Sequence, residues 1–596
     1  MRGIIYAPAH VEAGSRSGGG RHLQPSRFTA ADVARRRRRL RRLLPAVLAV
    51  AIAALIVGVV AGSGDGGKRE TAQRFVALWA RGDYRAMYAM LPDDTRAALS
   101  QAAFESAYRN AATTATTRSI AAGAAHDAEE GVVPVAVTVR TRVFGTVRGM
   151  LDVPVVEDGD AVRVAWRPSL VFPGLERGEQ LTRETRLPER GTLLARDGAV
   201  LAKGADRASD IPDVAGQVVG RLEPAPAEQR PALRALGYPD DAQVGVSGLE
   251  RVFQQQLAGT PGGRLLAGTR VLARSEPRAG RPVKTTISPA IERIATAQLG
   301  GRYGGIAAID PSSGEILALA GVAYSGLQPP GSTFKIITLV GALEAGIAKP
   351  DTQYPVVTEA SLSGVSIQNA NGESCGGSLV ASFAHSCNSV FAPLGAKLGA
   401  DRLVDVAERF GFNQPLGIPG AAVSTIPSAE QIGDDLAVGS SAIGQGMVQA
   451  TTLQMTLAAA TIANGGLRPV PTLELGARPR HVRVTSPRVA RQAARMMEAV
   501  VSEGTGTAAQ IDGVVVAGKT GTAELRSTVP SGDGDDPEHL QDDIPDTDAW
   551  FVAYGPARRP RVAVGVLFTE AGAGGAVAAP AAREVLVSGL QATSGG

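Results

Sequence analysis

The sequence lacks several features that would place it in a simple structural class. Among its 596 residues are only two cysteines and seven lysines, and no repeat with a period of about 20 to 50 residues is visible, which argues against a solenoid or propeller. Hydrophobic residues make up 44% and charged residues 20%, so nothing indicates wholesale disorder, collagen or a multi-span membrane protein. The length predicts three or four domains.

Excess positive charge is confined to the N-terminus. Residues 1–42 hold eleven arginines and two acidic residues, a net charge of +9, whereas the whole chain carries +4 and the rest therefore −5. Residues 43–62, LLPAVLAVAIAALIVGVVAG, contain no charge and match the roughly 20 residues that cross a bilayer as a helix. By the positive-inside rule, residues 1–42 form a cytoplasmic tail, and the chain after Gly62 is extracytoplasmic.

Two other interpretations of this N-terminus are weaker. Small residues after the apolar run could be a signal-peptidase site, but the run is longer than the core of a signal peptide, which has about 7 to 15 residues. The run Arg35–Arg39 has no aromatic or glycine residues between its arginines, so we interpret it as a topology signal and expect no nucleic-acid partner.

Three composition patterns follow the predicted transmembrane helix. Residues 67–178 have helical spacing first and alternating strands afterwards, which predicts a small α+β module. Residues 179–284 are richer in polar residues and form a second module. Residues 285–596 mix helical patterns with apolar strand-like runs, which is typical of a large catalytic domain. We therefore expect a multidomain α+β protein with a single transmembrane helix.

The first chemical motif is Ser332–Lys335, an S-x-x-K after two prolines and a glycine. Proline and glycine ahead of an apolar run predict a helix start, and residues three apart share a helix face. A neutral Lys335 amine could then take the proton of Ser332 as its hydroxyl attacks a carbonyl. Burial and a second nearby cation would lower the pKa of that amine.

Two further motifs follow it along the chain. Ser386–Asn388 is an S-x-N, whose hydroxyl can relay a proton and whose amide can hold a substrate backbone. Lys519–Thr522, K-T-G-T, continues an apolar strand that could pair with a peptide and bind its carboxylate. The backbone N–H groups of Ser332 and of this strand would form an oxyanion hole.

The specificity of these motifs lies in their combination. A lone S-x-x-K would indicate a capped, solvated helix, but all three motifs in this order match the serine acyl-transfer set. No histidine accompanies a G-x-S-x-G, so a histidine triad is not expected, and His385 is interpreted as structural. Residues 513–520, GVVVAGKT, also fit a phosphate-binding loop, but their valines predict a strand and Gly521 follows where a helix would have to begin.

The two cysteines, Cys375 and Cys387, lie on the predicted outer side, where a disulfide can persist. A bridge would close a loop of twelve residues and stabilise the fold by about 2 to 3 kcal/mol. Two buried free thiols are the alternative, because the sequence does not determine their distance.

With these residues, the sequence resembles the class B penicillin-binding proteins, monofunctional D,D-transpeptidases that cross-link peptidoglycan. The resemblance covers about 180–595. RGTLLARDGAVLA and GVSGLERVFQQQLAGTPG resemble the family's pedestal, while GGIAAIDPSSGEILALA, SAIGQGMVQATTLQM, IANGG and AWFVAYGP resemble its catalytic domain. The first module resembles the NTF2-like domain of the methicillin-resistance penicillin-binding protein. The resemblance implies an NTF2-like domain over 67–178, a pedestal or dimerisation domain over 179–284, and a transpeptidase domain of helices around an antiparallel sheet over 285–596.

The resemblance also implies a role for each residue of the first two motifs. Ser332 would be the acylated nucleophile and Lys335 its general base. Ser386 would relay a proton, and Asn388 would contact a substrate amide.

The third motif would bind the donor peptide. Lys519 would supply positive charge, and Thr520, Gly521 and Thr522 would meet the terminal carboxylate, with the Thr522 N–H completing the oxyanion hole. A D-Ala-D-Ala stem would lose its terminal D-alanine to form an acyl-enzyme, which passes to the amine of a second stem. β-Lactams would trap the serine, and no metal or organic cofactor would be needed. Expected partners are stem peptides, β-lactams and a glycosyltransferase of the division or elongation machinery.

Two other functional classes share these motifs. A D,D-carboxypeptidase or β-lactamase would let water reach the acyl-enzyme, and a non-catalytic sensor or scaffold would keep the fold while tolerating lost motifs. The pedestal and the anchor favour cross-linking. An acidic stretch over 525–548 is expected to be a solvated loop, with a lid beside the cleft as the alternative.

Overall fold

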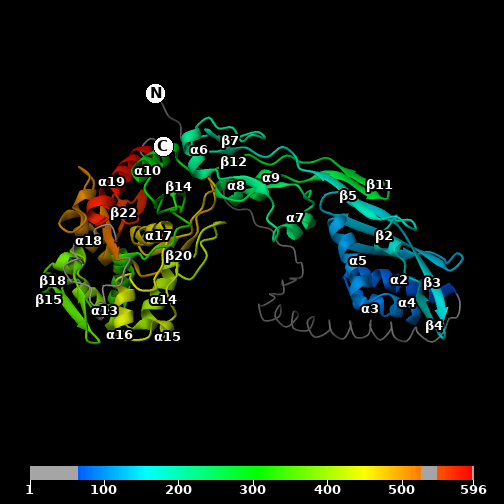
Figure 1. Cartoon of the computed structure of the whole chain (residues 1–596), viewed down its shortest axis with the longest axis horizontal. Helices are drawn as coiled ribbons and strands as arrows, with labels where there is room; N and C mark the ends of the chain where they lie inside the picture. The colour runs from blue at the N-terminus through cyan, green and yellow to red at the C-terminus, as the bar shows by residue number, and fades with distance from the viewer. Residues whose placement is uncertain (1–64, 525–546, 594–596) are drawn as a thin grey trace, which may run out of the picture. The chain divides into compact units, whose positions relative to one another are not determined.

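The computed structural model describes residues 65–524 and 547–593 (Figure 1). The predicted tail, the predicted transmembrane helix and most of the acidic stretch lie outside these residues. None of the helices within the described ranges is both long and apolar enough to span a membrane. The chain forms two compact units: one holds the described residues up to Ala98 with Ala122–Val135 and Asp152–Trp166, and the other holds the remainder.

Helices precede strands in the N-terminal part, as the sequence predicts. The helices are α2 (Asp65–Arg81), α3 (Tyr84–Tyr88), α4 (Asp93–Ala98) and α5 (Gln101–Thr114). The strands β1 (Thr117–Ala125), β2 (Val132–Thr141), β3 (Thr146–Asp158) and β4 (Ala161–Val164) form a sheet in the order β1-β2-β3-β4, and the 3-10 turn η1 (Pro168–Val171) follows. Strand β2 buries alternate valines from Val133 to Val139, because successive side chains point to opposite faces.

The next part consists of short elements. Its strands are β5 (Leu181–Arg186), β6 (Leu193–Leu194), β7 (Val200–Ala202), β8 (Leu222–Pro224), β9 (Gln243–Gly245), β10 (Gly262–Ala267), β11 (Arg270–Ser275) and β12 (Val283–Lys284). They form sheets in the orders β11-β10-β5, β12-β6-β7 and β8-β9. Its helices are α6 (Pro212–Val218), α7 (Arg230–Leu236), α8 (Gly248–Val252) and α9 (Gln254–Ala258).

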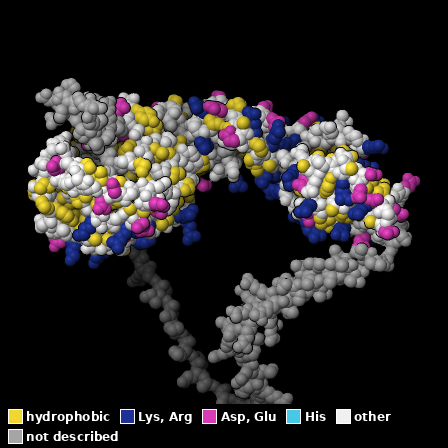
Figure 2. Space-filling model, turned by 60° about the horizontal axis from the view of Figure 1, so that its bottom comes forward, with side chains coloured by type: hydrophobic (Ala, Val, Ile, Leu, Met, Phe, Trp, Pro, Cys, Tyr) yellow, Lys and Arg dark blue, Asp and Glu magenta, His cyan; other side chains and the backbone are white. Residues whose placement is uncertain are grey.

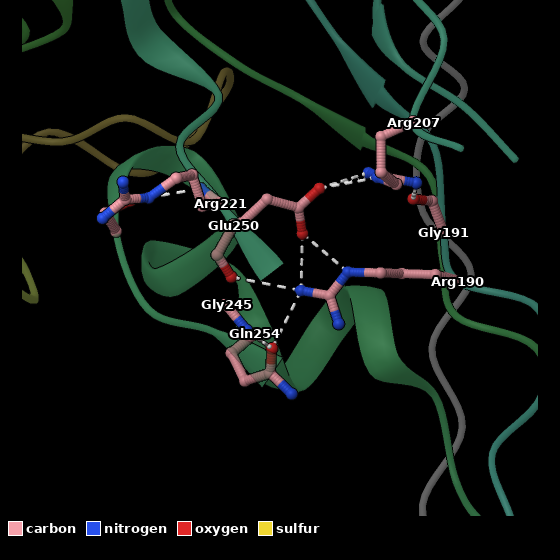
Figure 3. A network of polar contacts seen from close by, with 8 residues as sticks. Arg190, Gly191, Arg207, Arg221, Gly245, Glu250 and Gln254 are labelled. Carbon is pink, nitrogen blue, oxygen red and sulfur yellow. Dashed lines mark hydrogen bonds and ion pairs between the residues drawn. The ribbon is translucent and has the colours of Figure 1, made fainter. Parts of the chain in front are cut away.

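A buried ion-pair network joins these short elements (Figure 3). The Glu250 side chain is 1% exposed and accepts hydrogen bonds from Arg190 Nε at 2.6 Å and from Arg207 Nε at 2.7 Å. Arg190 also donates to Gln254 Oε1, which accepts from the Gly245 N–H as well. A buried carboxylate is tolerated when it is paired and hydrogen-bonded. The network therefore ties together the two sequence segments that carry the resemblance to a pedestal.

The C-terminal part is built on a five-stranded sheet in the order β14-β13-β23-β22-β21, in which all neighbours are antiparallel. Its strands are β13 (Gly304–Ile309), β14 (Ile316–Gly321), β21 (Ala517–Glu524), β22 (Thr547–Gly555) and β23 (Val562–Phe568). Along β22, Trp550 and Val552 belong to one hydrophobic core, and Phe551 and Ala553 belong to the other. The sheet is therefore covered on both faces, and β21 lies at one edge.

Helices pack on both sides of this sheet (Figure 1). Helices α10 (Pro289–Leu299) and α19 (Gly574–Ala592) share one core, and α11 (Lys335–Glu344) and α17 (Thr452–Ala463) contribute to the other. The remaining helices are α12 (Leu379–Ala384), α13 (Asn388–Leu398), α14 (Ala400–Phe410), α15 (Ala429–Ile432), α16 (Asp435–Ala442) and α18 (Pro487–Ser502), with 3-10 turns η2 (Gly331–Phe334), η3 (Ala370–Gly372) and η4 (Thr507–Ala509). Small strand pairs are β15 (Gln353–Val357) with β18 (Cys375–Ser378), β16 (Glu359–Leu362) with β17 (Val365–Gln368), and β19 (Leu467–Pro469) with β20 (His481–Arg483).

Two sequence interpretations near β21 are settled by these strands. Asp548, expected in the acidic loop, instead lies in β22 opposite Ala523 and is fully buried, and its Oδ1 accepts the Glu570 N–H. That expectation was wrong for Asp548 because acidic composition predicts exposure, whereas this residue already belongs to the strand. Gly521 continues β21 instead of starting a helix, which agrees with rejecting a phosphate-binding loop.

The surface carries mixed charge. In the view of Figure 2, lysine and arginine side chains are interspersed with aspartate and glutamate. Exposed ion pairs of the described residues include Arg234 with Asp240 and Arg264 with Glu184. Each such pair contributes at most about 1 kcal/mol to stability.

Candidate active site

The S-x-x-K motif lies on a 3-10 turn that leads into α11. Gly331–Phe334 form this turn, and the α-helix proper begins at Lys335. The helix was predicted to start before the serine. Gly331 has φ +51°, a left-handed conformation that an α-helix cannot contain. In a 3-10 turn, residues three apart eclipse one another, so Ser332 and Lys335 still share a side.

Glycines bring this turn against strand β21. A Cβ on Gly331 would lie 2.7 Å from the carbonyl oxygen of Thr522, and one on Gly521 would lie 3.0 Å from the Pro330 oxygen. Behind the turn, the Gly331 N–H donates to the Gly444 carbonyl at 2.9 Å. The first and third motifs therefore meet through their backbones, at a distance that larger residues would not permit.

Lys335 is fully buried and points at the S-x-N motif. Its Nζ donates to the Ser386 carbonyl and to Asn388 Oδ1, both at 2.6 Å, and lies 3.3 Å from Ser386 Oγ. Burial, and secondarily the charge of Lys519, lower the pKa of Lys335 well below its ordinary value. An unprotonated amine can donate two N–H groups to these oxygens and keep its lone pair for a proton.

Lys519 approaches the same hydroxyl from the opposite motif. Its Nζ donates to Ser386 Oγ at 2.8 Å and to the Thr520 carbonyl at 3.0 Å. Burial lowers the pKa of Lys519 to about 7. The Ser386 hydroxyl therefore lies between two buried amines, and the cost of burying two charges favours a neutral amine in the pair.

The S-x-N loop is held from both sides. Cys387 forms a disulfide with Cys375 of β18, with their Cα atoms 5.6 Å apart, so the bridge is formed rather than two free thiols. Ser386 has φ +62°, which a serine adopts only under restraint by its surroundings. Asn388 Nδ2 donates to the Gln368 carbonyl at 2.9 Å. These contacts direct Ser386 and Asn388 toward the lysines.

The threonines of K-T-G-T contact segments outside the three motifs. Thr520 Oγ1 lies 2.6 Å from Thr505 Oγ1, and Thr522 Oγ1 lies 3.5 Å from the Gly574 N–H at the start of α19. The sequence motifs did not single out Thr505. Its only local signal is a G-T-G-T run over residues 504–507, which follows α18 and ends at the first residue of η4.

The structure thus brings Lys335, Ser386, Asn388 and Lys519 into one hydrogen-bonded cluster. Within the described part of the chain, the Ser332 hydroxyl has no hydrogen bond to Lys335, although its turn contacts β21. The described ranges contain no group of three or more His, Cys, Asp or Glu that could hold a metal.

Comparison with known proteins agrees with this architecture. Residues 304–587 match the model of the penicillin binding protein transpeptidase domain, and residues 68–179 match the NTF2-like N-terminal transpeptidase domain. The peptidoglycan D,D-transpeptidase PbpA of Mycolicibacterium smegmatis is 32% identical over 440 residues, which cover 62% of this chain and 84% of the relative. PbpA of Mycobacterium tuberculosis is 33% identical over 387 residues, covering 53% and 74%.

Solved structures of penicillin-binding proteins are also similar to this chain. The crystal structure of PBPA from M. tuberculosis aligns with a TM-score of 0.54 and 28% identity, covering 68% of this chain and 99% of that one. Its penicillin G acyl-enzyme complex aligns with a TM-score of 0.53 and 29% identity, covering 68% and 100%. Fold and site define a serine acyltransferase that binds penicillin. The chain belongs to the penicillin-binding protein transpeptidase family, whose members similar to it include the mycobacterial PbpA enzymes.

The contact between Gly331 and β21 predicts an unequal effect of two alanine substitutions. Gly331→Ala and Gly346→Ala both place a side chain at positive φ, which costs about 1 to 2 kcal/mol. Gly346, just beyond the other end of α11, has no atom within 4 Å of its Cβ position, so Gly331→Ala should cost roughly 1 to 3 kcal/mol more. Thermal unfolding of the two variants measures this difference, and equal losses of Tm would contradict the close contact.

Proposed function

We propose that this protein cross-links peptidoglycan, with Ser332 as the nucleophile and Lys335 as its general base. The observation that carries the assignment is the Ser386 hydroxyl between two fully buried lysines, 3.3 Å from one and 2.8 Å from the other. Two facing amines that cannot both be charged supply a base at neutral pH. An exposed structural lysine would have no such property.

The reaction starts when the Ser332 oxygen attacks the penultimate D-alanine carbonyl of the donor stem and its proton passes to Lys335. The peptide C–N bond then breaks. The departing D-alanine amine takes a proton from Lys335 through the Ser386 hydroxyl, which lies between the two lysines. The amine of a second stem peptide attacks the ester, forms the cross-link and releases Ser332 with its proton restored.

Strand β21 supports the binding of the donor. It is the edge strand of its sheet, so an extended peptide can pair with it. Thr520, Gly521 and Thr522 would receive the terminal carboxylate beside Lys519, and Asn388 would hold an amide of the stem. The Ser332 and Thr522 N–H groups would stabilise the oxyanion, with roughly 3 to 4 kcal/mol per donor.

Residues 43–62 are proposed to anchor the enzyme in the membrane, with residues 1–42 in the cytoplasm and the catalytic domain outside. The charge asymmetry and the twenty-residue apolar run support this topology. An extracytoplasmic location also suits the disulfide of Cys375 with Cys387, since such bonds persist in oxidising compartments. Peptidoglycan stem peptides and β-lactams would reach the site there, and a separate glycosyltransferase would polymerise the glycan.

Labelling with a fluorescent penicillin tests the nucleophile. Ser332→Ala should abolish covalent labelling, because the other hydroxyl of the Gly331–Phe334 turn, that of Thr333, is buried and donates to the Pro330 carbonyl. Ser325→Ala, in the loop ahead of that turn, should label like the wild type. Labelling of Ser332→Ala at the wild-type rate would refute the assignment, and rapid loss of label from the wild type would favour the hydrolase alternative.

The pH dependence of acylation tests the lysine pair. Lys335 must be unprotonated to accept the serine proton, so the rate should rise with pH, with a midpoint well below the usual lysine pKa of about 10.4. Lys519→Met removes the cation that disfavours a charge on Lys335, so the pKa of Lys335 rises and the rising limb moves to higher pH. Lys349→Met, an exposed change beyond the end of α11, serves as the control. The measurement is the second-order rate constant of acylation as a function of pH. If the rate of Lys519→Met rises over the same pH range as that of the wild type, the charge of Lys519 does not affect the pKa of Lys335.

Cell fractionation tests the anchor. The full chain should stay in the membrane pellet after a high-pH wash, and a variant lacking residues 43–62 should not. N-terminal sequencing separates anchor from signal peptide: a mature chain that starts near Ser63 would show cleavage and overturn the anchor.

A further inference from the structure

Thr505 links two of the three motifs without belonging to any of them. It follows α18, and its N–H donates to the Ala384 carbonyl at the end of α12, just ahead of the S-x-N loop, at 3.1 Å. Its hydroxyl lies 2.6 Å from the Thr520 hydroxyl of K-T-G-T. A Cβ on Gly575 would lie 2.3 Å from the Thr505 carbonyl oxygen, so α19 packs against the same residue. Thr505 is therefore held on three sides.

The hydrogen bonds available to these two hydroxyls are unequal. Each hydroxyl has one proton to donate. If Thr520 donated to Thr505, the Thr505 proton would be left with the Ala384 carbonyl at 3.4 Å, a distance beyond that of a good O–H···O bond. If Thr505 donates to Thr520, the 2.6 Å bond is made and the Thr520 proton has no other acceptor among the described residues. Thr520 is 5% exposed, so that proton needs a partner.

We propose that Thr505 is a positioning residue that makes the Thr520 hydroxyl a donor toward an anionic group of the substrate. The inference rests on the proposed function, because the anion it concerns is the terminal carboxylate of the donor peptide or the carboxylate of a β-lactam. A carboxylate next to Thr520 supplies the missing acceptor. The Thr505 hydroxyl then donates to the Thr520 hydroxyl, and the Thr520 hydroxyl donates to the carboxylate. A neutral ligand at this position gains only the weaker hydrogen bond of an uncharged acceptor.

The test compares acylation by benzylpenicillin with acylation by its neutral methyl ester. Thr505→Val keeps the branched shape and removes the hydroxyl, so the acylation rate with benzylpenicillin should fall about tenfold, the scale of one charge-assisted hydrogen bond. The rate with the ester should fall less, because its carbonyl accepts only a neutral hydrogen bond. Thr505→Ser should restore the ratio of the two rates. In a Thr520→Val background, Thr505→Val should leave that ratio unchanged.

The outcomes separate this inference from the proposed function. A wild type that is not acylated at Ser332 would refute the function. A wild type acylated at Ser332, with Thr505→Val slowing acid and ester equally or neither, would refute only the role of Thr505. If Thr505→Val does not fold, Thr505→Cys is used instead, because cysteine is similar in size and its thiol is a weaker donor than a hydroxyl. This variant should also lower the ratio of the acylation rate with benzylpenicillin to that with the ester.

Discussion

The site depends on two fully buried lysine side chains that have no carboxylate partner among the described residues. Within residues 65–524 and 547–593, the hydrogen-bond acceptors around Lys335 and Lys519 are neutral oxygens: the carbonyls of Ser386 and Thr520, the Asn388 amide and the Ser386 hydroxyl. Such acceptors orient an ammonium group but do not compensate a full charge away from water. The pair therefore favours a neutral amine, which is what a base requires.

This arrangement needs rigid surroundings, because water that entered a looser site would solvate the ammonium forms of Lys335 and Lys519 and favour their protonation. Aromatic rings contribute on one side: Lys335 Nζ lies 5.8 Å from the centre of the Phe391 ring, and Lys519 Nζ lies 5.5 Å from that of Phe383. The disulfide holds the S-x-N loop at Cys387, and Ser386 keeps an unfavourable positive φ. Strain retained at a single residue is typical of a site whose surroundings determine it.

The sequence was sufficient for the parts of the fold and site that local pattern encodes. The alternating pattern in residues 67–178 predicted strands such as β2. The family resemblance predicted an antiparallel sheet with helices around it, and three short motifs identified the residues that cluster. Contacts that depend on tertiary packing could not be predicted from the sequence. The G-T-G-T run around Thr505 does not indicate that this residue meets Thr520. The helix start before Ser332 could not be corrected without the positive φ of Gly331. Asp548 was misplaced because its acidic neighbours predict a loop, while its burial depends on the pairing of β22 with β21, which the local pattern does not encode.

The contact between Gly331 and Thr522 joins segments that are far apart in the sequence, with α12 to α18 between them. Contacts of high sequence separation form late and slowly, because a long loop must close before they can stabilise the chain. Strand β21 and the Gly331–Phe334 turn can therefore meet only after the chain between them has been synthesised. It follows that a chain truncated before β21 carries both Ser332 and Lys335 but lacks the strand that completes the site.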